Sequence, residues 1–221
     1  MKKHLSFFIL AVLFFPLSGF CKAITEIDTI VPRFAFADLD INDLELLSKD
    51  TRLDMLDYFD VDSIVKMPNN MGGLSWIESL TPDFMQVHLT DASTLQLKTL
   101  GTSSGHFILM ALYTTGRMGD TQDTEVRFYD PDLNRIDGKK LLPLPSLKDL
   151  VTIPGNNRKK LEEIEKILPF HSIVFVADPV TNKLTATLSL GDILSIEDRD
   201  KIAPFLKPAV YTWNGKKFIL N

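Results

Sequence analysis

The chain has 221 residues, of which 45% are hydrophobic and 24% are charged, and this composition excludes a disordered chain and predicts a folded protein with a substantial core. Its formal net charge is −5, with 24 basic and 29 acidic side chains, which argues against nucleic acid as a partner. The length permits one large domain or two small ones, so the order of the predicted elements has to decide between them.

The first 23 residues have the pattern of a signal peptide. Lys2 and Lys3 begin it, an apolar run over residues 5–15 follows, and Pro16 breaks that run. The run is too short to cross a bilayer comfortably, and no later stretch approaches membrane-spanning length, so we expect no transmembrane segment in the mature chain. We therefore expect an exported protein that resides in the periplasm or cell envelope.

Cys21 leaves two processing routes open. Small side chains at Cys21 and Ala23 favour cleavage before Ile24, because signal peptidases read these two positions. The alternative is a lipid anchor on Cys21, since residues 17–19 resemble a bacterial lipobox, although Phe20 is bulkier than the residue expected there. Cys21 is the only cysteine of the chain, so cleavage before Ile24 would leave no disulfide.

Residues 38–60 carry the first helical pattern, after a short extended lead through Pro32. Their apolar side chains recur at helical spacing, and Asp50 or Thr51 can cap a second segment. We therefore expect two short helices here. Residues 68–73 then form a loop, because asparagine and paired glycines favour turns.

Short turns separate the next four strand-like segments, which predicts an antiparallel meander, since parallel crossovers need longer connections. Residues 105–115 contain a run in which both the odd-numbered and the even-numbered side chains are apolar. This pattern is expected of a central strand that is covered on both faces. A buried two-turn helix is the rival interpretation, but Gly105 precedes the run and β-favouring Tyr113 ends it. The other three segments alternate apolar and polar side chains, at residues 84–90, 95–98 and 124–130.

The first two alternating segments form a predicted hairpin. With residues 91–93 as its loop, Leu89 faces Leu95 across the two strands. The next apolar pair is then Val87 with Leu97, so the apolar side chains of both strands fall on one side of the sheet.

The second half of the chain follows a proline-rich connection. Residues 131–154 hold four of the 12 prolines. After this connection the pattern alternates helix and hairpin, namely a helix over residues 157–168, a hairpin over 173–190, a helix over 195–206 and a hairpin over 210–220. The pair Asn214-Gly215 is the most specific turn signal in the sequence.

This order of elements predicts an α+β fold with a mainly antiparallel sheet, N-terminal helices and two further helices in the second half. We expect a signal peptide over residues 1–23, a lobe of helices and meander over residues 24–140, and a helix-hairpin-helix-hairpin lobe over residues 141–221. In the alternative arrangement, all hairpins join one sheet.

Several short motifs carry a resemblance to a known family. They are RLDMLDY at residues 52–58, GGL at 72–74, LTPDF at 80–84, LTDAST at 89–94 and FYD at 128–130. Together they resemble the uncharacterised secreted Bacteroidales family DUF3256, over about residues 52–137. The resemblance implies an exported α+β protein, and it implies no activity, so it provides no functional residues.

Candidate metal ligands lack the spacing of a known site, so we predict no metal and no cofactor. The histidines outside the N-terminal segment are far apart, with no HExxH or cysteine pattern, and we interpret them as surface or edge residues; they are His88, His106 and His171. Two acidic clusters, at residues 38–42 and 130–134, repeat the alternate-oxygen spacing of a calcium loop. Neither has the glycine and glutamate that such a loop requires.

Catalytic motifs lack the surrounding sequence that their chemistry needs. Residues 101–105 match G-x-S-x-G, but they lie in an expected turn between two strands and not between a strand and a helix. Residues 63–66 match S-x-x-K without the S-D-N and K-T-G motifs that accompany it, so the usual activated nucleophiles are unsupported. Glycosidase carboxylates need only be close in space, so the sequence leaves a carboxylate-dependent site open. The densest acids, at residues 54–62, fit a solvated helix face better. We name no catalytic residue and favour a protein that is not an enzyme.

Aromatic side chains provide the only indication of a contact surface. Tyr129, Trp76, Tyr211 and Trp213 lie in strand-like segments, where an exposed ring would contact a carbohydrate or a protein; core packing is the alternative. We predict a non-enzymatic exported envelope protein that binds a protein or glycan partner. The alternatives are a carboxylate-dependent hydrolase of glycan or peptidoglycan and a structural lipoprotein subunit. The sequence does not identify the ligand-binding residues or the oligomeric state.

Overall fold

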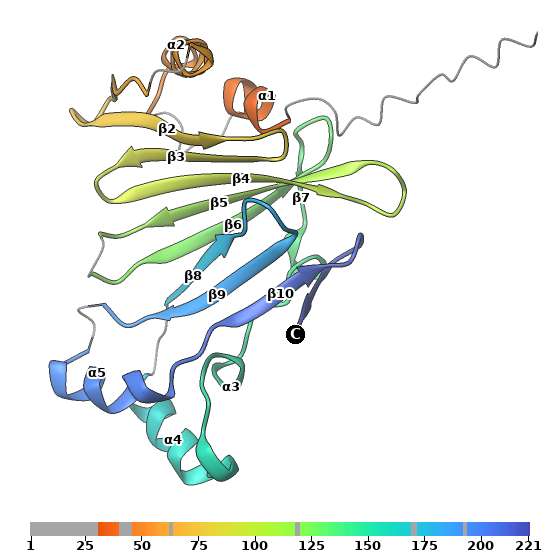
Figure 1. Cartoon of the computed structure of the whole chain (residues 1–221). Helices are drawn as coiled ribbons and strands as arrows, with labels where there is room; N and C mark the ends of the chain where they lie inside the picture. Colours follow the sequence, from red (N-terminus) through yellow and green to blue (C-terminus); the bar gives the residue numbers. More distant parts are fainter. Residues whose placement is uncertain (1–30, 40–45, 62–63, 118–119, 169–171, 192–193) are drawn as a thin grey trace, which may run out of the picture.

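The computed structural model describes residues 31–39, 46–61, 64–117, 120–168, 172–191 and 194–221. The predicted signal peptide, Cys21 and His171 lie outside the described residues, as does most of the acidic cluster at 38–42. In the described residues, two antiparallel sheets lie between two groups of helices (Figure 1), which confirms the predicted α+β class. Within the same residues, none of the helices combines the length and apolar character needed to span a membrane.

The first sheet is the predicted meander, in which each strand pairs with the strands before and after it in the chain. Its strands are β1 (Met67–Pro68), β2 (Leu74–Leu80), β3 (Phe84–Thr90), β4 (Ser93–Gly101), β5 (Phe107–Thr115), β6 (Asp123–Tyr129) and β7 (Arg135–Ile136). β5 lies inside the sheet between β4 and β6, so its doubly apolar run is a central strand and not a helix. β1, β2 and β7 extend the meander beyond the segments predicted from alternation.

The predicted register of the β3–β4 hairpin is wrong by two residues. Val87 pairs with Leu95 and Met85 with Leu97, whereas the prediction placed Leu89 opposite Leu95. The reason is a tighter turn with a bulge between His88 and Thr90, which sequence alternation does not reveal. A shift of two residues keeps every side chain on its predicted side, so the apolar face remains as expected.

Helices α1 (Val31–Asp38) and α2 (Lys49–Asp60) cover one face of the meander. The predicted extended lead through Pro32 is wrong, because Pro32 lies in the first turn of α1, where a missing N–H costs nothing. The side chain of Ser48, rather than Asp50 or Thr51, caps α2. Arg52 of α2 donates hydrogen bonds of 2.9 Å to two backbone carbonyls at the end of α1, which fixes the helix pair.

The hairpins of the second half form a separate antiparallel sheet in the order β11-β10-β9-β8. Its strands are β8 (Ser172–Ala177), β9 (Lys183–Ser189), β10 (Ala209–Trp213) and β11 (Phe218–Leu220). Gly215 in the β10–β11 turn has a φ of 87°, as the Asn-Gly signal predicts. The nearby helices are η3 (Gly138–Lys140), α3 (Leu147–Leu150), η4 (Pro154–Asn156), α4 (Arg158–Ile167), α5 (Ile196–Ile202) and η5 (Ala203–Phe205).

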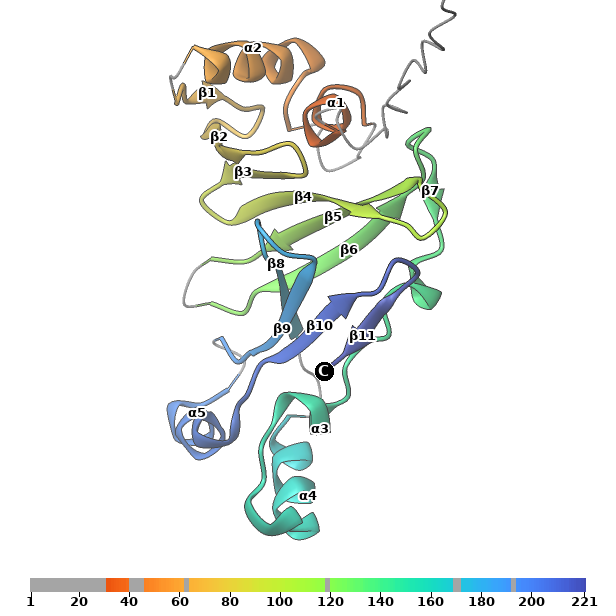
Figure 2. The same cartoon turned by 45° about the vertical axis from the view of Figure 1, so that its right-hand side comes forward.

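The second sheet packs on the other face of the meander, and apolar side chains of both sheets share one core. Its largest members are Phe84, Phe128, Phe175, Tyr211, Trp213 and Phe218. A smaller third core joins α3, α4 and α5 at the far end of the molecule (Figure 2). The meander is therefore sandwiched, with helices on one face and a sheet on the other.

Side chains of the meander accept hydrogen bonds from the backbone along the outer edge of β8. Backbone N–H groups of Ile173, Phe175 and Ala177 donate to Asp123 Oδ1, Thr124 Oγ1 and Gln96 Oε1 at 3.2, 3.1 and 3.0 Å. An open sheet edge exposes such groups to pairing with other chains, so these bonds seal the edge. Next to them, the buried Lys98 ammonium donates to Asp83 Oδ2 at 2.7 Å and to Pro179 O at 3.1 Å.

Candidate functional site

The second sheet covers only part of the meander face on which it lies. β8 packs against β4, β5 and β6, while β2 and β3 lie beyond the second sheet in both views of the fold (Figures 1 and 2). On β2 and β3 the same face bears Trp76, Gln86, His88 and Thr90, which are all half-buried. This open part of the face is the candidate functional site.

Trp76 is the centre of a stack at this site. The imidazole of His88, its partner across β2 and β3, lies parallel to the indole with 3.6 Å between ring centroids and 13° between planes. The ammonium of Lys66 lies 4.2 Å from the indole centroid. Lys66 precedes β1 on one side of β2 and His88 belongs to β3 on the other, so the two side chains occupy opposite faces of the indole.

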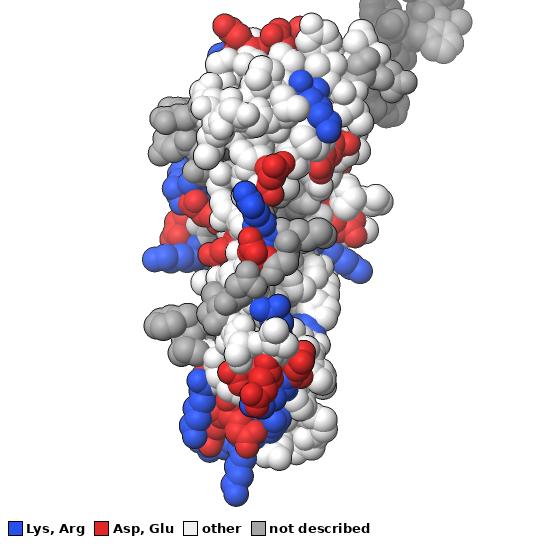
Figure 3. All heavy atoms as spheres, turned by 90° about the vertical axis from the view of Figure 1, so that its left-hand side faces the viewer, with Lys and Arg blue, Asp and Glu red and all other residues white. Residues whose placement is uncertain are grey.

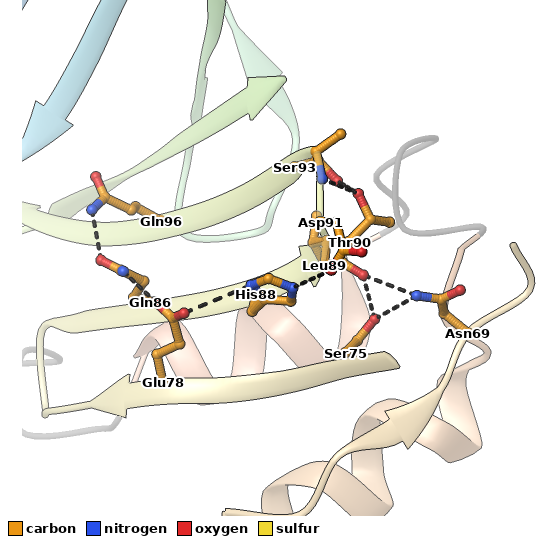
Figure 4. A network of polar contacts seen from close by, with 11 residues as sticks. Asn69, Ser75, Glu78, Gln86, His88, Leu89, Thr90, Asp91, Ser93 and Gln96 are labelled. Atoms are coloured by element: carbon orange, nitrogen blue, oxygen red, sulfur yellow. Dashed lines mark hydrogen bonds and ion pairs between the residues drawn. The ribbon is translucent and has the colours of Figure 1, made fainter. Parts of the chain in front are cut away.

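His88 lies between two carboxylates (Figure 4). Its Nδ1 is 3.8 Å from Glu78 Oε1 and its Nε2 is 3.8 Å from Asp91 Oδ1, both beyond hydrogen-bond distance. Nε2 is buried and has no hydrogen bond with any described residue. The imidazole is therefore held mainly by its stacking on Trp76.

A row of side-chain hydrogen bonds connects this site to the second sheet, and Figure 4 shows the part of it from Glu78 to Gln96. The amide of Gln86 donates to the Glu78 carboxylate, and Gln96 Nε2 donates to Gln86 Oε1 at 2.9 Å. The Oε1 atom of Gln96 accepts the N–H of Ala177, described above. One continuous row thus runs from β2, through β3 and β4, to the sealed edge of β8.

The loop between β1 and β2 is fixed by the buried side chain of Asn69. Its Oδ1 accepts the backbone N–H groups of Met71 and Gly73 at 3.1 and 3.0 Å. Its Nδ2 donates to Ser75 Oγ at 3.1 Å and to Leu89 O at 3.0 Å, so all four of its hydrogen-bonding positions are filled. This loop holds the Met71 side chain out to solvent at 78% exposure.

Two open pockets flank Met71 at this end of the meander. The first has a volume of about 530 Å³ and is bordered by Trp76, Lys66, Arg117 and Asp91. The second, of about 480 Å³, has the apolar side chains of Leu46, Met71 and Tyr113 in its lining. Both pockets touch Met71, Thr90 and Ala92, so they adjoin. In Figure 3, which shows this end of the molecule, charged side chains are densest at the bottom, over α4 and α5, and are more scattered above them.

The aromatic residues singled out from the sequence have different positions in the structure. Tyr129, Tyr211 and Trp213 are buried. For these three side chains the interpretation as core residues is therefore confirmed, and the interpretation as exposed contact residues is wrong. Trp213 Nε1 donates to Gly101 O at 2.6 Å inside the shared core. Only Trp76 lies at the candidate site. Lys66 and Arg117 belong to no recognisable sequence motif, so the sequence does not predict that they lie at this site.

The remaining sequence candidates do not form a site. Among the described residues, no group of three or more histidine, cysteine, aspartate or glutamate side chains is placed to hold a metal ion. His106 is exposed at the start of β5, far along the chain from His88. In the cluster at 130–134, Asp130 Oδ1 accepts the N–H groups of Asp132 and Asn134 at 3.0 and 2.9 Å, so it closes a turn.

Comparisons with known proteins agree with this fold. The family model described as a protein of unknown function, DUF3256, matches residues 36–218. A solved domain of an uncharacterized protein from Porphyromonas gingivalis W83 is similar in fold, with a TM-score of 0.73 at 15% identity, over 87% of this chain and 98% of that chain. Among curated proteins, none matches the sequence significantly.

Proposed function

Because the chain belongs to the DUF3256 family, whose description names no activity, we propose from the site alone that it is a non-enzymatic envelope protein that binds a protein or glycan partner through the open face of β2 and β3. One observation carries this proposal. The same sheet face is sealed over β4–β6 by the second sheet, yet over β2 and β3 it displays an ordered polar array to solvent. Ordered, unfilled surfaces with adjoining pockets are typical of binding sites.

The envelope location is part of the proposal and is supported by the sequence of the first 23 residues. Mass spectrometry of the native protein provides the test. A mature N-terminus at Ile24 is the expected result. An acylated Cys21 would favour the structural lipoprotein alternative, and an unprocessed chain would contradict export.

Crosslinking in intact cells tests the binding role. We expect a partner to be recovered with the native protein and lost with the double variant Trp76→Ala/His88→Ala. The matched control is Thr185→Ala/Thr212→Ala, which changes two half-buried side chains of the second sheet. Thermal melts establish that each variant is folded. Equal recovery of the partner with all three proteins would contradict a binding role for this face.

A carboxylate-dependent hydrolase is the second candidate, because Glu78 and Asp91 flank His88 on one open face. Two features disfavour it. Glycosidase acids depend on shielding from water, whereas the Asp91 side chain is 97% exposed. The Glu78 carboxylate is already engaged by Gln86. Turnover of an envelope polysaccharide that is lost in both Glu78→Gln and Asp91→Asn would establish the hydrolase and overturn the binding role.

A further inference from the structure

The charge of the first pocket points to the kind of partner. The whole chain has a net charge of −5, yet Lys66 and Arg117 both border this pocket. Neither cation forms an ion pair with another described residue. Asp91 is the one acid among the described lining residues, so the pocket has an excess of positive charge. Such a site favours an anionic group.

The Trp76 stack argues against recognition of a neutral sugar. A sugar ring packs against the open face of an aromatic side chain, but His88 and Lys66 occupy both faces of this indole. The stack instead orders the Lys66 ammonium, which would otherwise lose side-chain entropy when it binds a ligand. The pocket is therefore arranged for recognition of charge.

The second pocket adds an apolar contact beside the charged one. Met71 is 78% exposed and Leu74, on the rim of the first pocket, is 48% exposed. Exposed methionine is enriched on surfaces that bind other proteins. Asn69 fixes the loop that carries Met71, so the two pockets keep their relative positions without a partner.

We propose that the paired pockets around Met71 bind a segment of a partner protein in which an aspartate or glutamate side chain adjoins an apolar one. The carboxylate enters the first pocket between Lys66 and Arg117. The apolar side chain enters the second pocket against Leu46 and Tyr113. This inference rests on the proposed binding function and specifies the chemistry of its partner.

The test uses the full chain on an array of random twelve-residue peptides, with polygalacturonate and dextran as glycan probes. We expect the bound peptides to share an acidic residue next to an apolar one. The double variant Lys66→Ala/Arg117→Ala should weaken their binding by about tenfold or more, and Asp91→Asn should strengthen it, because it removes the one opposing charge. The control, Lys183→Ala/Lys216→Ala, removes the same charge from the second sheet and should leave binding unchanged.

Several results would overturn the inference. Peptides without acidic residues, no bound peptide at all, or equal binding by the Lys66→Ala/Arg117→Ala variant would each do so. Tighter binding of polygalacturonate than of any peptide would assign the pocket to an acidic glycan and overturn the protein partner. In that case the proposed binding function stands, whereas a native partner that crosslinks only to residues outside β2, β3 and the two pockets would overturn both.

Discussion

The covered and the open parts of one meander face differ in how similar polar side chains are used. Over β4 and β6, Gln96, Thr124 and Asp123 accept backbone N–H groups of β8 and are part of the junction between the sheets. Over β2 and β3, Gln86, Glu78 and His88 contact each other and solvent. Gln86 and Gln96 occupy equivalent polar positions in the alternation of their strands. The sequence pattern alone therefore does not show which of them contacts the second sheet and which is open to a partner.

The position of the second sheet decides which polar residues are available to a partner. Gln86 and Gln96 are hydrogen-bonded neighbours on adjacent strands, yet only Gln96 reaches β8. We expect changes in the covered part to lower stability and changes in the open part to affect binding.

The largest expected effect is in the covered core. Phe175→Ala removes a buried ring between the sheets and should lower the free energy of unfolding by about 3–5 kcal/mol. Trp76→Ala in the open part should cost less than about 2 kcal/mol, because its stack is half-exposed. Urea denaturation measures both values. Equal losses would show that the open part is as much a part of the core as the covered one.

A smaller effect is expected at the sealed edge. Thr124→Val keeps the side-chain shape but removes the hydroxyl that accepts Phe175 N–H at 3.1 Å and contacts Thr114 Oγ1 at 2.8 Å. A buried N–H without a partner should lower the free energy of unfolding by about 1–3 kcal/mol. Thr185→Val on β9 is the matched control and should have little effect. If both variants unfold alike, the edge bonds are not important for stability.

The covered core should also weaken at alkaline pH. Burial raises the pKa of Tyr211 to about 12, and the nearby Asp149 charge acts in the same direction. The unfolded chain then ionises at lower pH than the folded one, so stability is complete below about pH 10 and falls as pH rises toward 12. Tyr211→Phe removes a buried hydroxyl that has no hydrogen bond within the described residues. Urea melts at pH 9 and 11 should show a smaller decline for Tyr211→Phe than for the native protein, and equal declines would contradict this origin.

The smallest effect on stability is expected for the two cations of the first pocket, whose replacement should have the greatest effect on binding. Lys66→Ala/Arg117→Ala should change the free energy of unfolding by no more than about 1 kcal/mol, since surface cations contribute little. The same variant should lose the acidic peptides. A loss of stability as large as that of Phe175→Ala would assign these cations to the fold and not to a partner.

Much of the fold follows from sequence patterns with a clear physical basis. Alternation and short turns predict the meander strands β3–β6, and the doubly apolar run of β5 predicts its central place. Asn214-Gly215 predicts the β10–β11 turn. The errors have local causes: a bulge after His88 shifted the hairpin register, and the first turn of α1 tolerates Pro32.

The candidate site is less accessible from sequence because it depends on contacts between distant segments. Trp76 was singled out, but its partners Lys66 and His88 come from separate elements, and the prediction of an open ring did not anticipate their stacking. Arg117 borders the pocket from the β5–β6 connection. Nothing in the spacing of these residues indicates that they meet.

Site-specific photo-crosslinking in intact cells tests most directly whether the open face of β2 and β3 contacts a partner. A photoreactive residue replaces Leu74 at the rim of the open face or, as the control, Val176 on β8 in the second sheet; the two side chains are 48% and 47% exposed. We predict a discrete crosslinked product from position 74 that is absent from position 176 and is lost when Lys66→Ala/Arg117→Ala is combined with it. A product from position 176 alone would contradict the assignment of the partner surface to β2 and β3.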